Sequence, residues 1–394
     1  MKIAHVYFQF YPCEDGTSIE VYHISRKLVE REHDVTVITS NLMFYRQEKL
    51  PETETIDGIK VRRFPVRFPY PISKFVFTPS LIRGISSIEA DVFHVFTYLP
   101  MFLINYATFY AIRKGIPLVL TPIYHPARQT AYKGILPSLQ ANFYDRLVGP
   151  RILRRADCIT AYSPADGSFY SQIGAKDVCV RGMGVDEAEC PPEALEDFTK
   201  RYNLTENTIL SANRLERRKG IQHIIEAMPM ILKEYPDTRL LVAGEDMGFK
   251  RYLDELVARL GVEASVVFTG HLSRSEVPCA FKVSKMFLLP SYYDVLPLAP
   301  LEAWLHKIPI VISSKVWGTA DLVTPENGIV IKEPSHYKAI AEAVVELLSN
   351  PRKSQAMGEN GHRLVEEQFT WDSVVDKIEA VYKTVTSRRR ELST

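Results

Sequence analysis

The chain has 394 residues, of which 46% are hydrophobic and 24% charged, and its formal net charge is +1. A chain of this length is too long for a single compact core and predicts two domains of about 150–200 residues each. The composition is that of an ordinary globular protein. A net charge this close to zero excludes a globally basic protein that binds nucleic acid, so an anionic ligand must be held by a local cluster.

Along the first half of the chain, short apolar runs alternate with helical patterns. A helix is predicted after the turn-rich stretch Tyr11-Pro-Cys-Glu-Asp-Gly16, with Thr17 and Glu20 at capping-box spacing. Strands are predicted at residues 2–8, 34–39, 60–64, 92–96, 117–121, 158–162 and 178–181. This alternation indicates βαβ units and a parallel sheet.

The apolar stretch from Val92 to Ile112 is long enough to be compared with a membrane span. It contains His94, Pro100 and Asn105, which would interrupt such a span near its first third. We interpret the stretch instead as a buried strand, a turn and a buried helix.

Five cysteines occur, an odd number without a CxxC pair: Cys13, Cys158, Cys179, Cys190 and Cys279. A disulfide framework or a zinc site is therefore not expected, and a reducing compartment fits best. The first ten residues lack the long apolar stretch of a signal peptide. These features predict a cytoplasmic location.

The second half repeats the alternation after a polar, acidic stretch, residues 187–206, which is predicted to be a linker. Strands are predicted at residues 208–212, 239–243, 265–269, 286–289, 309–312 and 328–331, and final helices at 337–348, 352–368 and 371–385. The stretch Arg388–Arg390 is expected to be a solvated end. Each half should therefore be a doubly wound α/β domain.

The strongest local signal follows the strand at 208–212 and reads Ser211-Ala-Asn-Arg-Leu-Glu-Arg-Arg-Lys-Gly220. Four cations, Arg214, Arg217, Arg218 and Lys219, lie within six residues before a helix whose first amide groups can donate. Such a turn suits a diphosphate, and a solvated basic loop explains the same residues equally well. The turn lacks the Walker and GxGxxG patterns of ATP and NAD sites.

A second signal follows the strand at 286–289. Asp294 lies in the turn after it, and Glu302 lies eight positions later in a predicted helix. A carboxylate can accept hydrogen bonds from two sugar hydroxyls, so both residues are candidates for binding a sugar or ribose. The plainer interpretation is that Asp294 caps a helix and Glu302 is a surface residue. Both signals lie at the carboxyl ends of strands, where open α/β sheets bind ligands.

The motifs and their order along the chain resemble those of the retaining family 4 glycosyltransferases, which have the GT-B fold. The family patterns G-R-L-x-x-x-K-G and E-x7-E correspond to residues 213–220 and 294–302, and the turn at 11–16, Arg181-Gly-Met-Gly-Val-Asp186 and Phe369-Thr-Trp371 also match. The resemblance covers nearly the whole chain. It implies two Rossmann-like domains facing across a cleft: residues 1–187 for the acceptor and 188–370 for the nucleotide sugar, with a helix, 371–394, crossing back to the N-terminal domain.

The resemblance implies an enzyme that moves a hexosyl unit from a nucleotide-diphosphate sugar to an acceptor hydroxyl with retention. Arg214 and Lys219 would hold the donor diphosphate and offset charge on the departing nucleotide. Glu302 would accept the ribose hydroxyls, and Asp294 would contact the donor sugar. No metal and no other cofactor is implied, because the cations take the place of Mg²⁺.

Four further positions take roles from the same resemblance. The amides around Leu296 and Leu298 would approach the sugar and the β-phosphate, and Gly16 would let the N-terminal loop come close to the donor or acceptor. His125, after the strand at 117–121, matches a histidine near the reacting sugar carbon and would be catalytic together with Arg214 and Lys219. A lone histidine is otherwise more often structural.

Departures from the family pattern concern both motifs. Asp294 replaces a glutamate, Val295 and Asn213 replace glycines, and Met183 replaces an asparagine. We interpret these changes as donor or acceptor specialisation. A sugar-nucleotide epimerase on the same fold and a non-catalytic subunit that binds nucleotide sugars remain the alternatives, and no lysine motif indicates a pyridoxal-phosphate phosphorylase.

The partners expected are a UDP-, GDP- or ADP-linked sugar and a glycan or lipid-linked acceptor, with no nucleic acid. The stretch Arg146-Leu-Val-Gly-Pro-Arg-Ile-Leu-Arg-Arg155 mixes four arginines with apolar residues, and Lys74-Phe-Val-Phe-Thr-Pro adds aromatic rings. Such mixtures can dock on an anionic membrane surface, here the inner face, or can simply pack as a surface helix.

Overall fold

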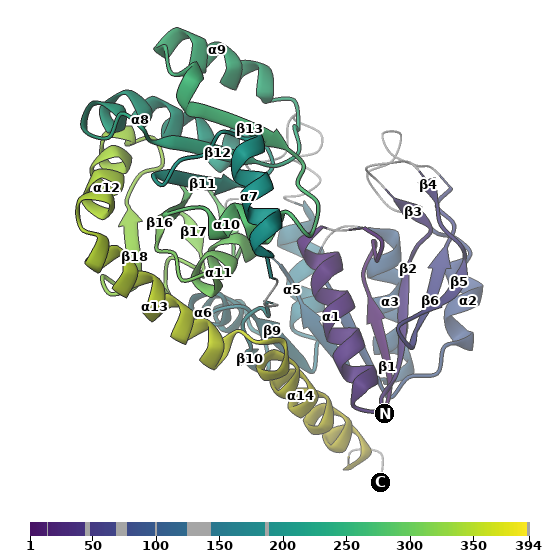
Figure 1. The fold of residues 1–394 in the computed structure, drawn as a ribbon. Helices are drawn as coiled ribbons and strands as arrows, with labels where there is room; N and C mark the ends of the chain where they lie inside the picture. Colours follow the sequence, from purple (N-terminus) through teal and green to yellow (C-terminus); the bar gives the residue numbers. More distant parts are fainter. Residues whose placement is uncertain are drawn as a thin grey trace. The chain divides into compact units, whose positions relative to one another are not determined.

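The structure, a computed structural model, describes residues 1–13, 15–43, 48–67, 77–98, 101–123, 143–185 and 189–391. The chain divides into two compact units: unit 1 contains residues 1–184 and 371–394, and unit 2 contains residues 185–370 (Figure 1). Each unit is built around its own parallel sheet. The predicted fold class, two Rossmann-like α/β domains, is therefore confirmed.

Unit 1 has an eight-stranded sheet of order β10-β9-β8-β7-β1-β2-β6-β5. The strands are β1 (Lys2–Val6), β2 (Asp34–Ser40), β5 (Thr53–Ile56), β6 (Ile59–Phe64), β7 (Val92–Phe96), β8 (Leu118–Thr121), β9 (Cys158–Ala161) and β10 (Val178–Val180), beside a short pair, β3 (Leu42–Met43) and β4 (Glu48–Lys49). Strand β5 pairs antiparallel with β6 at the edge and was not predicted, because its sequence is polar and largely exposed. The order reverses between β1 and β7, which makes the sheet doubly wound.

The helices of unit 1 cover both faces of this sheet. They are α1 (Gly16–Glu30), α2 (Leu81–Gly84), α3 (Phe102–Lys114), α5 (Gly149–Leu153), α6 (Pro164–Gln172) and α14 (Trp371–Glu391), with short turns at Ile85–Ser87 and Tyr144–Val148. Apolar residues of α1 and α14 form the core on one face, and those of α3, α5 and α6 form the core on the other.

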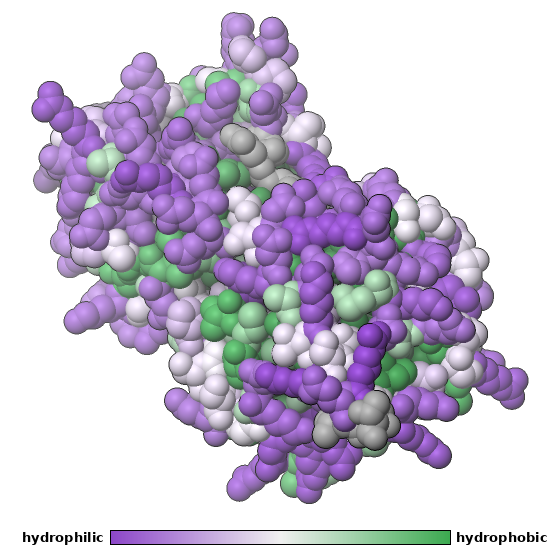
Figure 2. Space-filling model, turned by 90° about the horizontal axis from the view of Figure 1, so that it is seen from below, coloured by the Kyte–Doolittle hydropathy of each residue, from purple (hydrophilic) through white to green (hydrophobic). Residues whose placement is uncertain are grey.

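The apolar stretch at 92–112 supplies strand β7 and helix α3, as predicted. None of the described helices combines the length and the apolar composition needed to cross a membrane. Hydrophilic residues cover most of the face shown in Figure 2, and hydrophobic residues appear there as separate patches.

Helix α14 crosses back to unit 1, as predicted. It buries seven large side chains in the core of that unit: Trp371, Val374, Val375, Ile378, Val381, Tyr382 and Val385. The Tyr382 hydroxyl also contacts two buried histidines, His5 on β1 at 3.0 Å and His94 on β7. Apolar packing and a buried polar contact thus fix the last helix.

Arg388 and Arg390 are exposed, as predicted for a solvated end, and Arg389 is partly buried. These residues form the last turn of α14, where cations interact favourably with the helix dipole. Arg388 pairs with Asp177 at 2.9 Å, and Arg389 donates to the carbonyl oxygen of Gly115 at 2.9 Å. The helix end is therefore attached to two loops of unit 1.

Unit 2 has a six-stranded parallel sheet of order β13-β12-β11-β14-β16-β18. Its strands are β11 (Thr208–Ala212), β12 (Arg239–Ala243), β13 (Val266–Gly270), β14 (Met286–Leu289), β16 (Ile310–Ser313) and β18 (Gly328–Ile331), and a small pair joins β15 (Asp294–Val295) to β17 (Val316–Trp317). The helices are α7 (Pro192–Arg201), α8 (Ile221–Glu234), α9 (Lys250–Leu260), α10 (Val277–Lys282), α11 (Leu298–Leu305), α12 (Tyr337–Ser349) and α13 (Pro351–Gln368). In sequence order this is the 3-2-1-4-5-6 arrangement of a dinucleotide-binding sheet, whose switch point lies between β11 and β14.

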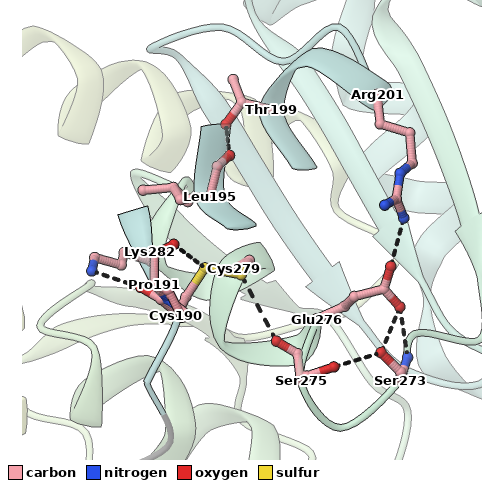
Figure 3. The surroundings of a disulfide bond; sticks show 10 residues. All are labelled: Cys190, Pro191, Leu195, Thr199, Arg201, Ser273, Ser275, Glu276, Cys279 and Lys282. Carbon is pink, nitrogen blue, oxygen red and sulfur yellow. Dashed lines mark hydrogen bonds and ion pairs between the residues drawn. A yellow bond between two sulfur atoms is a disulfide. The ribbon is translucent and has the colours of Figure 1, made fainter. Parts of the chain in front are cut away.

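Two expectations for the start of unit 2 are wrong. The predicted linker at 187–206 contains helix α7, because proline at a first helical position and good helix formers after it favour a helix despite the polar composition. Cys190, two residues before α7, forms a disulfide with Cys279 on α10, 89 positions later (Figure 3). Folding brings the two Cα atoms to 5.1 Å, a proximity that sequence spacing does not reveal.

Candidate active site

The two sequence motifs of unit 2 meet at the switch point of its sheet. The loop after β11 and the loop after β14 run side by side, and the Tyr292 amide donates to the carbonyl oxygen of Arg218 at 2.8 Å. Gly220 has a φ of +74°, and a Cβ there would lie 2.0 Å from the Pro290 carbonyl oxygen. Only glycine allows this approach, so the backbone itself joins the two motifs into one site.

Asp294 lies at the centre of this site. Its Oδ2 is 2.7 Å from the Lys219 Nζ and accepts from the Ser291 hydroxyl at 2.9 Å, while its Oδ1 is 3.3 Å from the Arg218 Nη1. The plainer interpretation of Asp294 as a helix cap is wrong, because no side chain caps α11. The carboxylate instead gathers two cations.

Arg214 joins the same group through an acidic bridge. Glu216 lies between two guanidinium groups, with Oε1 3.3 Å from the Arg214 Nε and Oε2 2.7 Å from the Arg218 Nε. The Arg214 side chain is 44% exposed and is therefore accessible to a ligand. Sequence reasoning missed Glu216 and Ser291, since neither stands out by residue type or spacing.

Burial and charge act in opposite directions on this group. Burial lowers the pKa of the Lys219 ammonium, and the neighbouring Asp294 carboxylate opposes that change. Burial alone would raise the pKa of Asp294, but the charges of Lys219 and Arg218 bring it below its usual value. With both groups ionised, three cations and two carboxylates (Arg214, Arg218, Lys219; Glu216, Asp294) leave a net charge of 3 − 2 = +1.

Glu302 lies on α11, beyond the contacts of the Asp294 group. Its side chain is half-buried, and in the described part of the chain no hydrogen-bond donor or cation contacts its carboxylate. Burial raises the pKa of Glu302 to about 7. This raised pKa, at a position next to the Asp294 group, makes Glu302 a candidate for binding a ligand.

The turn before α11 presents two different kinds of amide. Leu296 has a φ of +36°, is buried, and uses its amide to donate to the Trp317 carbonyl oxygen at 3.1 Å. Leu298 is the first residue of α11, which begins after Pro297 without a capping side chain. The amides of Leu298 and Ala299 have no acceptor within the helix and can donate to a ligand, as at anion-binding helix starts, whereas Pro300 has no N–H.

Gly16 lies in unit 1, where it begins α1 after β1, at the switch point of that sheet. Asp15 caps the helix by accepting from the amides of Thr17 and Ser18 at 3.2 Å each. The capping box predicted for Thr17 and Glu20 is therefore wrong, because the Asp15 carboxylate already satisfies these amides. Glu20 is fully buried and pairs instead with Arg181.

The catalytic prediction for His125 falls outside the described residues, so it stays a prediction. The described residues contain no group of three or more histidine, cysteine, aspartate or glutamate side chains arranged to hold a metal ion. In unit 2 the structure therefore brings Lys219 and Asp294 into contact and links Arg214 to them through Glu216, and it places Glu302 and Leu298 together on α11.

Comparisons with known proteins agree with this architecture. The sequence profile described as "Glycosyl transferases group 1" matches residues 194–385, and that described as "Glycosyl transferase 4-like domain" matches residues 15–182. An uncharacterised glycosyltransferase of Methanocaldococcus jannaschii is 25% identical over 408 residues, covering 97% of this chain and 98% of that protein.

A second relative is more similar over a shorter length. The GDP-mannose-dependent monoacylated alpha-(1-6)-phosphatidylinositol monomannoside mannosyltransferase of Corynebacterium glutamicum is 30% identical over 209 residues, 50% of this chain and 53% of that protein. Among solved structures, Anabaena HepE in complex with UDP and glucose superposes with a TM-score of 0.75 at 17% identity, covering 98% of this chain and all of that one, and so supports the fold. The chain therefore belongs to the group 1, family 4 type of glycosyltransferases with the GT-B fold, and it is an enzyme of that class.

Proposed function

We propose that this glycosyltransferase moves a hexosyl unit from a nucleoside-diphosphate sugar to an acceptor hydroxyl with retention of configuration, and that unit 2 binds the donor nucleotide. One observation carries the proposal: the switch point of unit 2 gathers a cluster of net charge +1 beside the uncapped start of α11 and the unpartnered Glu302. Cations and amide donors suit a diphosphate, and a carboxylate suits the ribose.

Leaving-group stabilisation would be the main catalytic contribution. As the sugar departs, negative charge grows on the diphosphate, and Arg214, Lys219 and the first amides of α11 are already in place to stabilise it. These groups supply fixed positive charge, and we propose that no metal ion or other cofactor is required.

Retention is proposed to proceed by attack on the same face of the sugar, with the donor phosphate taking the acceptor proton. A double displacement would need a free carboxylate beside the reacting carbon. Asp294 is a poor candidate for that role, because Lys219, Arg218 and Ser291 already bind both its oxygens. His125 is proposed to lie near the reacting carbon, and Gly16 to let the first loop of unit 1 approach the donor or the acceptor.

The relatives narrow the choice of substrates to be tested. The HepE structure holds UDP and glucose, and the Corynebacterium relative is named for GDP-mannose and a phosphatidylinositol mannoside. We propose a UDP-, GDP- or ADP-linked hexose as the donor and a lipid-linked or polysaccharide glycan as the acceptor.

Contact with an anionic membrane surface would present such a lipid-linked acceptor. Arg146, Leu147 and Arg151 are exposed around the start of α5, next to Phe143, which is 61% exposed. This mixture of cations and apolar groups supports peripheral docking on an anionic membrane surface. If the chain fails to sediment with anionic liposomes at low salt, the docking part of the proposal is rejected.

A thermal-shift screen tests the donor site directly. UDP, GDP, ADP and their hexose conjugates are compared, because a ligand that binds only the folded state raises the melting temperature with the logarithm of its concentration over Kd. Arg214→Ala and Lys219→Ala should abolish the shift while remaining folded. A shift that survives both substitutions would place the diphosphate elsewhere and refute the assignment.

A further inference from the structure

The carboxylate of Asp294 is unusually well fixed for a group expected to contact a sugar. Its two oxygens are occupied by Lys219, Arg218 and Ser291, and only 14% of its side chain is exposed. An aspartate has a short side chain, and the backbone of its loop is joined to the 217–220 turn. Asp294 therefore cannot turn towards another ligand without leaving the buried Lys219 ammonium unpaired.

Arg218 is itself fixed by groups other than Asp294. Its Nε is 2.7 Å from Glu216, its Nη1 donates to the Tyr293 carbonyl oxygen at 3.3 Å, and its guanidinium lies 5.0 Å from the centre of the Tyr293 ring. These contacts come from both motifs, so Arg218 holds the two loops together at the point where Asp294 lies.

Lys219 gains a defined direction from this arrangement. An ammonium group has three N–H donors, and Asp294 accepts one of them at 2.7 Å. Because Arg218 shares the same carboxylate, the negative charge of Asp294 is divided between two cations, and Lys219 keeps donors and charge for a further anion. Arg218 is one of the three cations whose total charge exceeds that of the two carboxylates by one.

We propose that Arg218 and Asp294 are positioning residues for the donor diphosphate, with Asp294 orienting the Lys219 ammonium and Arg218 holding Asp294 in place. The inference rests on the proposed function and changes one part of it, because Asp294 then acts through Lys219 and not as a ligand of the donor sugar. Arg218 becomes as necessary to the diphosphate site as Lys219.

Calorimetric titration separates the two roles of Asp294. The nucleoside diphosphate that the wild type binds best is titrated alone and as its hexose conjugate. Asp294→Asn should weaken both ligands by the same factor, about ten- to a hundredfold, because the orientation of Lys219 is lost. If Asp294 instead binds the donor sugar, the substitution should weaken the binding of the hexose conjugate only. The free diphosphate should then bind equally or more tightly, because a nearby negative charge is removed. That second pattern overturns the inference.

Arg218→Gln tests the other half, with Arg217→Gln as its matched control. Both substitutions remove one positive charge from the same turn, but Arg217 is exposed and its side chain makes no contact with Asp294 among the described interactions. Arg218→Gln should weaken the free diphosphate at least about tenfold, and Arg217→Gln by no more than about threefold. Equal losses would show an effect of net charge alone and overturn the inference.

Circular dichroism and melting curves establish that each variant is folded. If Asp294→Asn does not fold, the comparison of Arg218→Gln with Arg217→Gln decides the question. If the wild type binds none of the nucleoside diphosphates, the proposed function itself fails, and the inference fails with it. If the wild type binds a nucleoside diphosphate and Asp294→Asn weakens only its hexose conjugate, the inference is rejected and the proposed function stands.

Discussion

Glu302 gives a pH dependence whose sign can be worked out. Burial raises its pKa to about 7 in the folded chain, from an ordinary value of 4.5. Between these values the folded state holds a proton that the unfolded state has released, so the free energy of unfolding falls as the pH rises through this window. Glu302→Gln removes the cost of ionisation and is expected to stabilise the protein by up to about 3 kcal/mol at pH 8, and hardly at pH 4.5.

Urea denaturation of wild type and Glu302→Gln at pH 5 and pH 8 measures this difference. The same variant should bind a nucleoside diphosphate more weakly, because an amide cannot accept two ribose hydroxyls as a carboxylate does. A gain in stability with a loss in binding is the pattern of a group retained for function. An equal stability difference at both pH values would contradict the assigned pKa.

Unit 1 contains a buried ion pair between Glu20 and Arg181, which we expect to contribute to stability. Both side chains are fully buried; Tyr162 donates to Glu20 at 2.7 Å, and Arg181 donates to the Gly182 carbonyl oxygen at 2.9 Å. Arg181→Met leaves the Glu20 carboxylate buried without its cation and should cost about 3–5 kcal/mol. The double variant with Glu20→Gln should recover part of that loss in chemical denaturation. A single-variant cost below about 1 kcal/mol would show that water replaces the pair.

At this scale the sequence indicates residue types better than partnerships. The cation motif identified Arg214 and Lys219 correctly as members of one turn, because charge density and the following helix are visible in the sequence. The contact of Lys219 with Asp294, 75 positions apart, depends on two loops meeting at a switch point. The roles of Glu216 and Ser291 depend on the same folded geometry and leave no local signal.

Among the elements, α7 and α10 are joined at both ends. The disulfide between Cys190 and Cys279 lies at the start of α7, where Lys282 also donates to the Cys190 carbonyl oxygen at 3.2 Å. At the end of α7, Arg201 pairs with Glu276 at 2.6 Å (Figure 3). The covalent bond closes a loop that includes β11, α8, β12, α9 and β13, and so restrains much of unfolded unit 2.

Loss of this bond should lower the stability of unit 2 by about 2–4 kcal/mol. A dithiol reductant is expected to lower the melting temperature of the wild type but not that of a Cys190→Ser/Cys279→Ser double variant. Cys179→Ser, which removes an unbonded cysteine of unit 1, is the control and should respond to the reductant as the wild type does. Identical melting curves with and without reductant would mean that the bond adds no stability or is not formed.

Buried parallel strands were the elements most readily predicted. Strands β11, β12, β14 and β18 begin and end at the predicted residues, because continuous apolar runs between polar turns leave few alternatives. The edge strand β5 and helix α7 were missed for the opposite reason: their residues are polar, so no apolar run marks β5, and the proline and helix formers that favour α7 carry little apolar signal. The cap of α1 was misplaced because Asp15 and Thr17 are both good capping residues.

The whole molecule depends on a helix that is distant in sequence from the unit it completes. The seven apolar side chains of α14 lie in the core of unit 1. Burying each contributes about 1.5–3 kcal/mol, so their sum is comparable to the entire stability of an ordinary domain, about 5–15 kcal/mol. Residues 1–184 alone should therefore not fold, whereas residues 185–370 contain a complete core of their own.

Three fragments test this dependence. Residues 185–370 should melt cooperatively and bind the nucleoside diphosphate with the affinity of the full chain, since the Asp294 group and Glu302 all lie within them. Residues 1–184 should be soluble only when co-expressed with residues 371–394. Without α14, the sheet face that α1 and α14 cover together would expose apolar residues of the core. Tyr382→Phe in the co-expressed fragment should weaken the association, because the hydroxyl that contacts His5 and His94 is lost. If residues 1–184 fold alone, unit 1 does not require α14 for folding, and the prediction is wrong.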